Sequence, residues 1–541
     1  MDENMPDSQI GGRRGKNIRN HLFMVYGIIN SVLQGESGPV DISVYDIRQC
    51  FDSIWLEEAM NDLYETVDKE QRDNKLALVY LNNRDNRVQV NTPVGETERT
   101  SIQDIVLQGS VHGPALCSCQ MGQLGKICKK KVIHQFHYKK LVKVMNLQMV
   151  DDLLDIQECG FKSVASNTFI NTQIEMKRLT LHKDKCKQIH VGEDYSFCPT
   201  LKVHDSNMKS VTQDKYLGDE ICNNIYGNEG SNYKNIKVRK SAGLGINAQI
   251  MTLLQTVSLG YFYFDIAALL RESMLVGGCL FNSEVWYGLT QHNISELEEV
   301  DKALLRRILE APISVPGESL FLELGLTPIK YIVMGRRVMY LHYLVNLKKE
   351  EMLHQFFIAQ WENPAKNDWT ETVKKDLECL GIKCDLKEIQ KKKKEQFREM
   401  VKRSIKSVAF NYLMELKRKH SKMNNLQYTE LKQQNYLSSK LVPPYKAKSL
   451  FRFRVRADRV KCNYKNSYSD LSCPLCLVTE DKSEHLLDCV RIKEKCVNVR
   501  VNATSKYMDI FSSSIEKMIA AVDLLDTAMK VRESLLDEQV H

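Results

Sequence analysis

The sequence lacks the features that would place the chain across a membrane or outside the cell. Its longest apolar region, residues 260–283, is interrupted by three charged side chains, so there is no uninterrupted apolar run of about 20 residues to cross a bilayer. The chain begins Met1-Asp2-Glu3-Asn4 and no apolar signal core follows, unlike a secretory signal peptide. We therefore expect an intracellular protein of the nucleus, the cytoplasm or both, neither secreted nor inserted into a membrane.

Internal repeats and extended low-complexity tracts are also missing, and the composition excludes wholesale disorder. Of 541 residues, 43% are hydrophobic and 27% charged, a globular balance in a chain long enough for about three or four domains. The 16 cysteines have no secretory context, so we expect reduced thiols or metal ligands in place of disulfides.

The formal net charge of +8 is modest, but the basic residues are clustered. Any one cluster is compatible with a solvated helix face, whereas several together favour a polyanionic partner. The clusters are residues 129–131, 391–394 and 417–419, with Arg452, Arg454 and Arg456.

Two adjacent acids, Asp151 and Asp152, are flanked on both sides by apolar residues. This pattern predicts a strand–turn–strand hairpin that carries the acids at its tip. Two carboxylates this close resist sharing a site as free anions, so a buried or cleft-facing pair indicates a hard divalent cation such as Mg²⁺. Adjacent acids are also common on solvated turns, and the pair alone does not decide between the two.

A third acid, Asp46, ends a predicted strand. Val40, Ile42 and Val44 alternate with other residues, and Asp46 continues their face, which places a carboxylate at the rim of a sheet. An ordinary capping or turn aspartate would show the same pattern.

Near the C-terminus, Cys473 and Cys476 are followed by His485 and Cys489. A Cys-x-x-Cys turn directs two thiolates at one point, and His-x-x-x-Cys places an imidazole and a thiolate one helical turn apart, which completes a tetrahedral Zn²⁺ shell. Free thiols that happen to show this spacing are the alternative. With four protein ligands the zinc would be structural. The arginine–aromatic segment 452–456 before it suits phosphates and bases.

Periodicity and punctuation predict further elements, and from about residue 235 to about residue 435 the pattern is helical. The predicted elements are helices over 22–33, 55–67 and 169–181; a helix with its apolar stripe over 294–308 and a capping box of Ser295 and Glu298; hairpins over 87–102 and at 215–218; a mobile loop over 11–16; and a linker at Pro443 and Pro444.

The order of these features resembles the reverse transcriptase of non-LTR (LINE-type) retrotransposons. The resemblance covers roughly residues 8–495, includes the zinc knuckle, and is carried by ordered motifs. Residues 45–52 resemble the first acidic motif, 108–110 the template and nucleotide loop, 150–152 the aspartate hairpin, 181–186 the next motif, and 215–218 the primer grip.

The resemblance implies that Asp46 and Asp151 bind two Mg²⁺ ions, with Asp152 as a supporting acid beside them. Such a pair of ions activates a primer 3′-hydroxyl and stabilises the attacked phosphate. Because adjacent strand residues point to opposite faces, we expect Asp151 to be the direct ligand. Lys185 would neutralise or protonate the leaving pyrophosphate, although an exposed lysine is the ordinary interpretation.

The remaining site residues are implied in the same way. Phe51 matches a position whose ring blocks a ribose 2′-hydroxyl, with a core phenylalanine as the alternative. Gln108 and Gly109 would bound the nucleotide pocket, and the primer grip would consist of Tyr216, Leu217 and Gly218.

The implied fold class is α+β. A polymerase palm, an antiparallel sheet packed on helices, would be followed by a mostly helical thumb and C-terminal region and a small zinc knuckle. The expected division is 1–38 partial fingers, 39–225 palm, 226–345 helical thumb, 346–440 basic helical connector, 441–500 basic linker and CCHC zinc knuckle, and 501–541 C-terminal helix.

The implied function is an RNA-directed DNA polymerase whose partners are an RNA template, a DNA primer and deoxynucleoside triphosphates. Two departures predict a truncated or decayed copy: the chain begins at what resembles the last part of the fingers, without an endonuclease domain, and Met149 replaces an aromatic residue. The alternative function is a catalytically inactive protein that binds nucleic acid through basic helices and the zinc knuckle. A metal-dependent nuclease would leave the Gln-Gly loop and the primer-grip hairpin unexplained.

Overall fold

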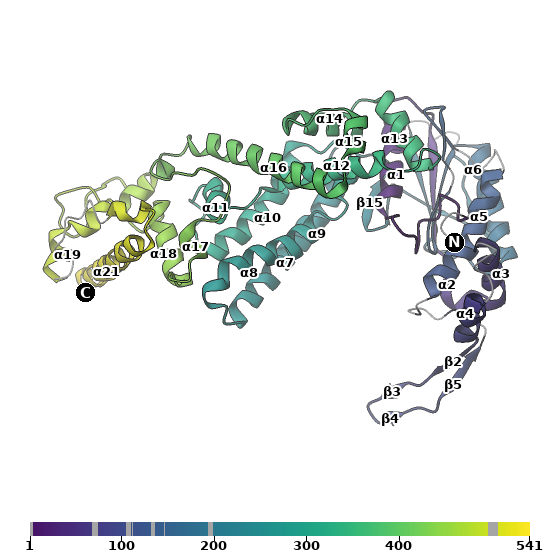
Figure 1. Cartoon of the computed structure of the whole chain (residues 1–541), viewed down its shortest axis with the longest axis horizontal. Coiled ribbons are helices and arrows are strands. Elements are labelled where there is room, and N and C mark those ends of the chain that lie inside the picture. The colour runs from purple at the N-terminus through teal and green to yellow at the C-terminus, as the bar shows by residue number, and fades with distance from the viewer. Residues whose placement is uncertain are drawn as a thin grey trace.

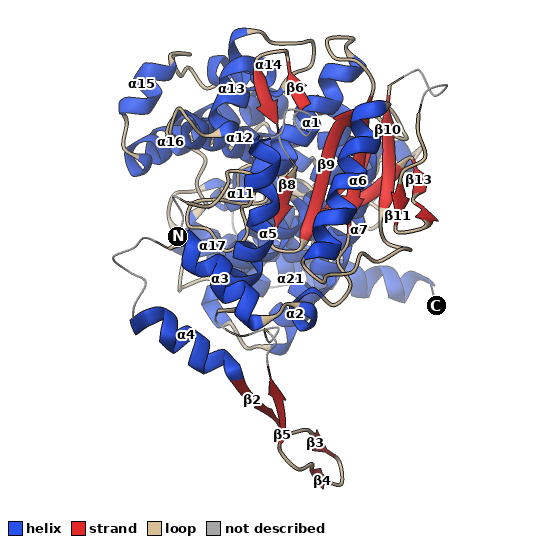
Figure 2. Ribbon diagram, turned by 90° about the vertical axis from the view of Figure 1, so that its right-hand side faces the viewer, coloured by secondary structure: helices blue, strands red, loops and turns tan. Residues whose placement is uncertain are grey.

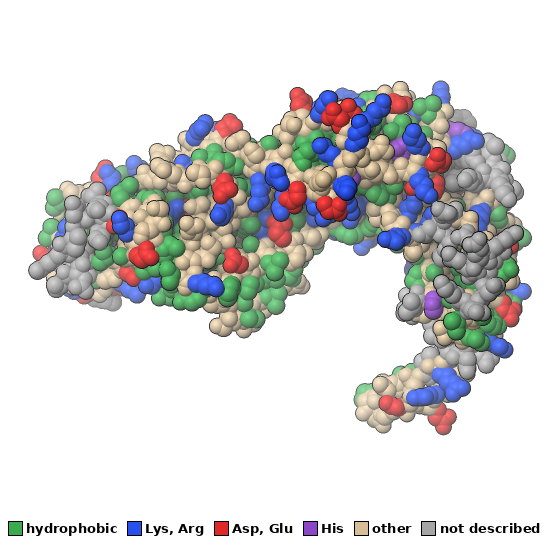
Figure 3. Space-filling model, viewed as in Figure 1, with side chains coloured by type: hydrophobic (Ala, Val, Ile, Leu, Met, Phe, Trp, Pro, Cys, Tyr) green, Lys and Arg blue, Asp and Glu red, His purple; other side chains and the backbone are tan. Residues whose placement is uncertain are grey.

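The computed structural model describes residues 4–67, 74–103, 106, 110, 112–130, 136–144, 146–192, 198–495 and 507–540. The molecule is elongated, with a sheet-containing N-terminal half at one end and a helical C-terminal half at the other (Figure 1). A long hairpin arm curves beneath the helical half, so the chain borders a concave face (Figures 1 and 3).

A five-stranded sheet forms the centre of the N-terminal half, in the order β13-β10-β1-β9-β8. The central strand β1 is antiparallel to both β10 and β9, β8 is antiparallel to β9, and only the edge strand β13 runs parallel to its neighbour β10. The strands are β1 Val40–Tyr45, β8 Leu147–Met149, β9 Asp152–Glu158, β10 Lys187–Val191 and β13 Lys209–Val211.

The two faces of this sheet differ in polarity. One face carries Val40, Ile42 and their apolar cross-strand partners, which pack against the buried helix α1 (Arg19–Leu33). The other face is polar, and helix α6 (Phe161–Met176) lies across it (Figure 2). Here Asn167 of α6 donates a hydrogen bond to the Tyr45 hydroxyl at 3.0 Å. The central strand β1 is therefore buried on both of its faces, and one of these faces is polar.

Asp155, which is 3% exposed on this polar face, should limit stability above pH 6. Burial raises its pKa from 3.8 to about 6 despite hydrogen bonds from Ser166 and Gln157. A raised aspartate pKa means that the folded state binds more protons, so wild-type stability falls as pH rises from about 4 to about 6. We expect the stability of Asp155→Asn relative to wild type to rise by about 2–3 kcal/mol across that window.

Thermal unfolding at pH 4.5 and pH 7.5 measures this difference. Asp205→Asn, at an exposed position, is the matched control and should track wild type at both pH values. An Asp155→Asn variant whose melting temperature stays parallel to wild type would contradict the expected burial cost.

The other elements of the N-terminal half surround the sheet or extend from it. Strands β2 to β5 form the arm that continues from α4 (Figures 1 and 2). The elements are α2 Cys50–Ser53, α3 Leu56–Thr66, α4 Asn74–Arg84, β2 Asp85–Val88, β3 Asn91–Thr92, β4 Gly95–Glu96, β5 Thr100–Gln103, α5 Gly113–Lys130, β6 Phe136–Tyr138, β7 Val142–Val144, β11 Lys202–Val203, β12 Ser206–Asn207, β14 Gln213–Tyr216 and β15 Asp219–Cys222.

The C-terminal half consists of helices. One connected set of buried apolar side chains runs from α1 through these helices to the C-terminal helix α21. The helices are α7 Ser231–Thr256, η3 Gly260–Phe262, α8 Tyr263–Leu270, η4 Arg271–Val276, α9 Gly277–Cys279, η5 Ser283–Val285, α10 Gln291–Leu309, α11 Gly317–Leu324, α12 Ile329–Val345, α13 Met352–Glu362, α14 Trp369–Cys379, α15 Leu386–Lys391, α16 Lys394–Lys417, η6 Ser421–Met423, α17 Asn435–Ser438, α18 Pro444–Arg454, η7 Lys461–Ser467, η8 Glu484–Leu487, α19 Val490–Lys495, η10 Asp509–Phe511 and α21 Ile515–Val540.

The predicted α+β class is confirmed: a mostly antiparallel palm sheet packed on helices is followed by a helical region. The division into six segments stays a prediction. Among the described residues, every helix is too short or too polar to cross a lipid bilayer.

Three local predictions were wrong in position. Helix α10 is capped by Thr290, whose side chain accepts from the backbone of Asn293 in a reciprocal box, so it starts before Ser295. The helix expected over 169–181 spans 161–176. Pro444 stands in the first turn of helix α18 and not in a linker, since proline is well accommodated where helical N–H groups have no partner.

Candidate active site

Asp46, Asp151 and Asp152 meet at one end of the palm sheet. Tyr45, the last residue of β1, pairs with Leu153 of β9, so Asp46 follows β1 where Asp152 begins β9. Met149 pairs with Asp152, which leaves Val150 and Asp151 as the two-residue turn between β8 and β9. The predicted aspartate hairpin and the strand-end position of Asp46 agree with this geometry.

The turn places a valine in an unfavourable backbone conformation. Val150 has φ of 60°, the left-handed region that a β-branched residue rarely adopts. The first position of a two-residue hairpin turn requires this conformation, and glycine or asparagine usually occupies it. Such strain persists where surrounding contacts fix the backbone.

Gln9 supplies these contacts. Its Oε1 accepts hydrogen bonds from the backbone N–H of Val150 at 3.1 Å and of Gly11 at 2.8 Å, and its Nε2 donates to the Val150 carbonyl at 3.2 Å. Gln9 is fully buried. Both backbone polar groups of the strained residue are therefore bound by a single side chain.

The N-terminal segment forms an extra strand-like contact beside β8. The Ile10 N–H donates to the Gln148 carbonyl at 2.9 Å, and the Gln148 N–H donates to the Ser8 carbonyl at 2.8 Å. A Cβ at Gly11 would lie 2.4 Å from the Val150 nitrogen, so only glycine permits this approach. The mobile loop predicted over 11–16 therefore begins with a packed residue.

Replacing Gln9 should slow catalysis without weakening nucleic-acid binding. In Gln9→Ala, Val150 loses two hydrogen bonds and Gly11 loses one. Asp151 is then less well positioned, so we expect the single-turnover rate of primer extension to fall about 10- to 100-fold. The affinity for primer–template, measured by fluorescence anisotropy, should not change. Gln355→Ala, at an exposed position on α13, is the control. An equal loss of rate and affinity would argue against a positioning role.

The charges of the three carboxylates interact. Partial burial, followed by the charges of Asp151 and Asp46, raises the pKa of Asp152 to about 6. Burial is also the main cause that raises the pKa of Asp151. Lys185 Nζ lies 3.3 Å from Asp46 Oδ1, and its side chain remains 60% exposed.

Hard oxygen ligands that repel one another fit a divalent cation, which would relieve that repulsion. The oxygens of the three carboxylates do not all lie within 4.8 Å of one another. The ligand atoms of two other groups of side chains among the described residues do lie that close together.

The hairpin of β14 and β15, which was predicted to be the primer grip, lies next to these aspartates. Its turn residues Leu217 and Gly218 have φ of 47° and 87°, as a tight two-residue turn requires. Tyr216 is buried, and burial together with the Asp152 charge raises its pKa. The Tyr216 hydroxyl lies 3.1 Å from Nδ1 of the buried His21 on α1.

A buried acid, Asp219, anchors this hairpin. Its carboxylate accepts from the Trp286 indole at 2.9 Å, from Arg239 at 2.8 Å and from the Tyr26 hydroxyl at 3.1 Å. Trp286 directly follows η5, Arg239 lies in α7 and Tyr26 lies in α1. The hairpin is therefore fixed to the helical half as well as to the palm.

The predicted nucleotide-pocket residues are placed only in part. Phe51 lies in the short helix α2, is partly buried, and packs against the core beneath α3 and α5. Gln108 and Gly109 lie outside the described residues.

The four predicted zinc ligands converge. The ligand atoms of Cys473, Cys476, His485 and Cys489 all lie within 4.8 Å of one another. Cys473 Sγ is 3.8 Å from Cys489 Sγ, and Cys476 Sγ is 3.3 Å from His485 Nε2. Ligands of a tetrahedral zinc ion lie about 3.3–3.8 Å apart, so these side chains fit the ion.

The arginines before this cluster are engaged within the protein. Arg454 is 4% exposed, pairs with Glu323 at 3.2 Å and donates to the Ile510 carbonyl at 2.8 Å. Arg456 pairs with Glu484 at 2.9 Å. The expectation that the segment 452–456 binds phosphates and bases is therefore wrong for Arg454, which links α11 to the C-terminal region.

A basic cavity of about 1030 Å³ lies between α12, α16 and the N-terminal segment. Helix α16 packs closely on α12: a Cβ at Gly335 would lie 2.3 Å from Ile405 Cδ1. Four exposed cations line the cavity from α16, and none forms an ion pair with a residue that the structure describes. They are Lys394, Arg398, Lys402 and Lys406.

A short stretch of the N-terminal segment connects this cavity to the aspartate hairpin. Gly11 contacts Val150, and Lys16 lines the cavity; five extended residues span at most about 18 Å. In Figure 3, Lys and Arg side chains, mixed with acidic ones, gather where the helical half meets the palm. The α16 cations recur every four residues, and this spacing is visible in the sequence. The basic cluster identified at 391–394 includes only Lys394 of the four.

An antiparallel sheet with carboxylates at the ends of adjacent strands, beside an anchored hairpin, is a polymerase palm. Residues 1–221 match the sequence model of the family described as reverse transcriptase (RNA-dependent DNA polymerase). This part of the chain is therefore similar in sequence to reverse transcriptase domains.

Solved structures similar to the chain include two yeast telomerases. Apo telomerase from Candida tropicalis has 11% identity and a TM-score of 0.33, covering 65% of this chain and 57% of that chain. Telomerase from Candida albicans in complex with a TWJ fragment of telomeric RNA has 10% identity and a TM-score of 0.32, with coverages of 68% and 53%. The chain thus spans little more than half the length of these structures. A search of curated proteins finds no match.

Proposed function

We propose that the protein is an RNA-directed DNA polymerase of a LINE-type retroelement. The observation that carries the proposal is the meeting of Asp46, Asp151 and Asp152 at the ends of adjacent palm strands, beside the hairpin of Tyr216. The family match over residues 1–221 supports the same reaction. Its substrates would be deoxynucleoside triphosphates and a primer paired to an RNA template, and it would act inside the cell, in the nucleus, the cytoplasm or both.

Each residue of the site has a distinct task in this reaction. When bound, two Mg²⁺ ions would lower the pKa of the primer 3′-hydroxyl and stabilise the attacked phosphate. Asp46 and Asp151 would hold them, and Asp152 would add negative charge beside them. Lys185, within 3.4 Å of Asp46, would offset charge on the leaving pyrophosphate. The anchored hairpin would position the primer end.

The basic cavity supports a nucleic-acid partner. Cations without acidic partners attract phosphates, and each contact makes binding more sensitive to salt. The stripe of Lys394, Arg398, Lys402 and Lys406 is therefore proposed to bind the template or primer backbone near the site. The cluster of Cys473, Cys476, His485 and Cys489 would hold one structural zinc ion.

Primer extension with the purified protein tests the proposal. We expect Mg²⁺-dependent incorporation of deoxynucleotides on an RNA template, lost with EDTA, and little incorporation of ribonucleotides. A protein that retains a cooperative unfolding transition and binds primer–template but extends no primer would refute polymerase activity.

The α16 stripe also favours a second candidate function, a nucleic-acid-binding protein without catalysis. Arg398→Glu with Lys402→Glu should weaken binding and reduce its salt dependence under either function, so these variants test the stripe and not the reaction. Only the polymerase predicts that Asp151→Asn abolishes extension while binding persists.

A further inference from the structure

A second cluster of metal-ligand side chains lies at the end of the palm sheet opposite Asp46. Asp41 of β1 pairs directly with His190 of β10, so both point to the same face of the sheet. Asp41 also pairs with Gln157 of β9, and Cys159, two residues further on, continues that face. Cys198 follows β10 in sequence and lies against the same group.

The four side chains form a compact set. The ligand atoms of Asp41, Cys159, His190 and Cys198 all lie within 4.8 Å of one another. His190 Nδ1 is 3.2 Å from Asp41 Oδ1, and Cys198 Sγ is 3.4 Å from the same oxygen. These separations match the distances of about 3.3–3.8 Å between ligands of a tetrahedral zinc ion.

Asp41 buries a carboxylate of which one oxygen has no hydrogen-bond partner among the described residues. Its side chain is buried. Oδ1 accepts from Gln188 Nε2 at 3.0 Å and also faces His190 and Cys198, whereas Oδ2 is buried and has no hydrogen-bond partner among the described residues. A buried carboxylate without a full set of partners is costly, and direct bonding to a cation is one of the few arrangements that offset this cost.

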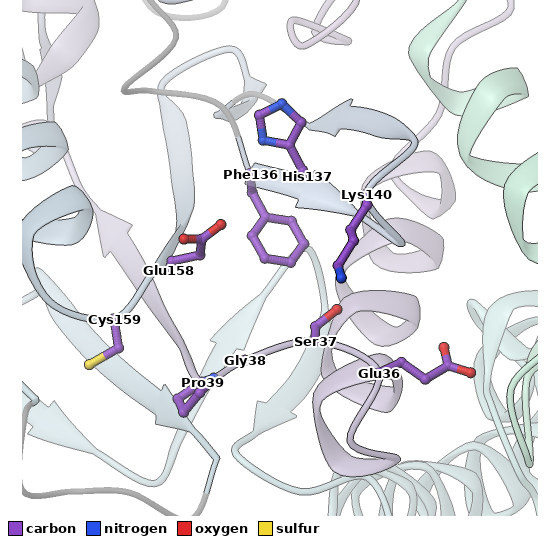
Figure 4. A pocket seen from close by; sticks show the side chains of 9 residues that line it. All are labelled: Glu36, Ser37, Gly38, Pro39, Phe136, His137, Lys140, Glu158 and Cys159. Carbon is purple, nitrogen blue, oxygen red and sulfur yellow. The ribbon is translucent and has the colours of Figure 1, made fainter.

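We propose that Asp41, Cys159, His190 and Cys198 hold a second zinc ion. Two thiolates and an imidazole are ligands that zinc prefers over magnesium or calcium, and the carboxylate completes four protein ligands, as in a structural site. Cys159 also lines a cavity of about 460 Å³ with Pro39 and Glu158 (Figure 4).

Such an ion would link three strands and one loop. It would bind β1, the end of β9, β10 and the segment that begins at Cys198, and so fix the base of the strand whose other end carries Asp46. This site does not depend on the proposed polymerase function, because its evidence lies in side chains remote from the carboxylates of the active site.

Metal content of the full-length protein tests the proposal. Purified under reducing conditions in the presence of zinc and then desalted, wild type should hold two zinc ions per chain by mass spectrometry of the metal. Cys159→Ser with Cys198→Ser should hold one, as should Cys473→Ser with Cys476→Ser. Cys379→Ser, an exposed cysteine outside both clusters, should retain two. One ion in wild type, or a second ion that survives the first double substitution, would overturn the proposal.

A measurement on unmodified protein covers the case in which the double variant does not fold. Zinc-edge X-ray absorption should average about 2.5 sulfur ligands per ion, from five thiolates over two sites, against three for the C-terminal cluster alone. Mass spectrometry after thiol alkylation then detects the competing structure: a Cys159–Cys198 disulfide in the purified protein, with one zinc ion per chain, would overturn the proposal.

Discussion

Asp46→Asn and Asp151→Asn should each reduce the rate of primer extension by at least about 10³-fold, which corresponds to about 4 kcal/mol of transition-state stabilisation. Each substitution removes a charged oxygen ligand. Both oxygens lie where the end of β1 meets the turn between β8 and β9. The shape of the side chain is nearly unchanged, so the affinity for primer–template should stay within about twofold. Single-nucleotide incorporation under single-turnover conditions measures the rate.

Asp205→Asn is the matched control for these variants. Asp205 is exposed in the turn between β11 and β12, outside the residues of the site, and forms no ion pair with a described residue. It should extend primers at the wild-type rate. Lys185→Ala provides a graded comparison: it removes a half-exposed cation beside Asp46, and we expect a loss of about tenfold.

The two aspartate variants also separate chemistry from folding. Both should retain the zinc content and the unfolding profile of wild type, because the side chains of Asp46 and Asp151 form no hydrogen bond to a helix among the described residues. If Asp46→Asn extends primers normally, the meeting of the three acids is not a catalytic centre. If both variants lose binding as well as extension, the carboxylates organise the palm and do not act in a chemical step.

The sequence predicted those parts of the site whose signals are local. Val40, Ile42 and Val44 alternate along one strand, so the position of Asp46 at its end follows from strand periodicity alone. The four cysteine and histidine ligands near the C-terminus lie within 17 residues of one another, so their convergence follows from turn and helix spacing.

Helix α6 was misplaced because its packing side is not apolar. The residues of α6 that are buried against the sheet include Ser163, Ser166 and Asn167, which match the polar face of β1 and β9. A search for apolar periodicity therefore favours a later window. The start of α10 was misjudged for a related reason: Thr290 and Ser295 both precede a suitable partner by three residues, and only tertiary packing selects Thr290.

Two features of the structure could not be predicted without knowing the register of the sheet. Gln9 and Val150 are 141 residues apart, and no local pattern indicates that an N-terminal glutamine binds the aspartate hairpin. Likewise Asp41, Cys159 and His190 come from three strands, and their convergence depends on which residues pair across β1, β9 and β10. Cross-strand pairing of this kind is not encoded in the spacing along one chain segment.

Removing the zinc ligands near the C-terminus should unfold that end of the molecule selectively. In Cys473→Ser with Cys476→Ser, the segment 461–495 loses the ion that would bring its turn and helix together, and binding of a structural zinc ion contributes directly to folding. Helix α21 packs on this segment, and Arg532 pairs with the buried Asp481 at 2.7 Å. We therefore expect amide protection to fall by at least about tenfold in both 461–495 and 515–540.

Hydrogen exchange with peptide resolution measures this loss, and the palm provides an internal reference. Peptides covering β1 and β10 should exchange at the wild-type rate, because the palm sheet and the C-terminal cluster lie at opposite ends of the molecule (Figure 1). Cys462→Ser is the matched control, since Cys462 lies in the same segment but outside the ligand set. His485→Cys should preserve protection, because four thiolates also bind zinc tetrahedrally. If the double variant keeps wild-type protection, the convergence of these side chains does not depend on a metal.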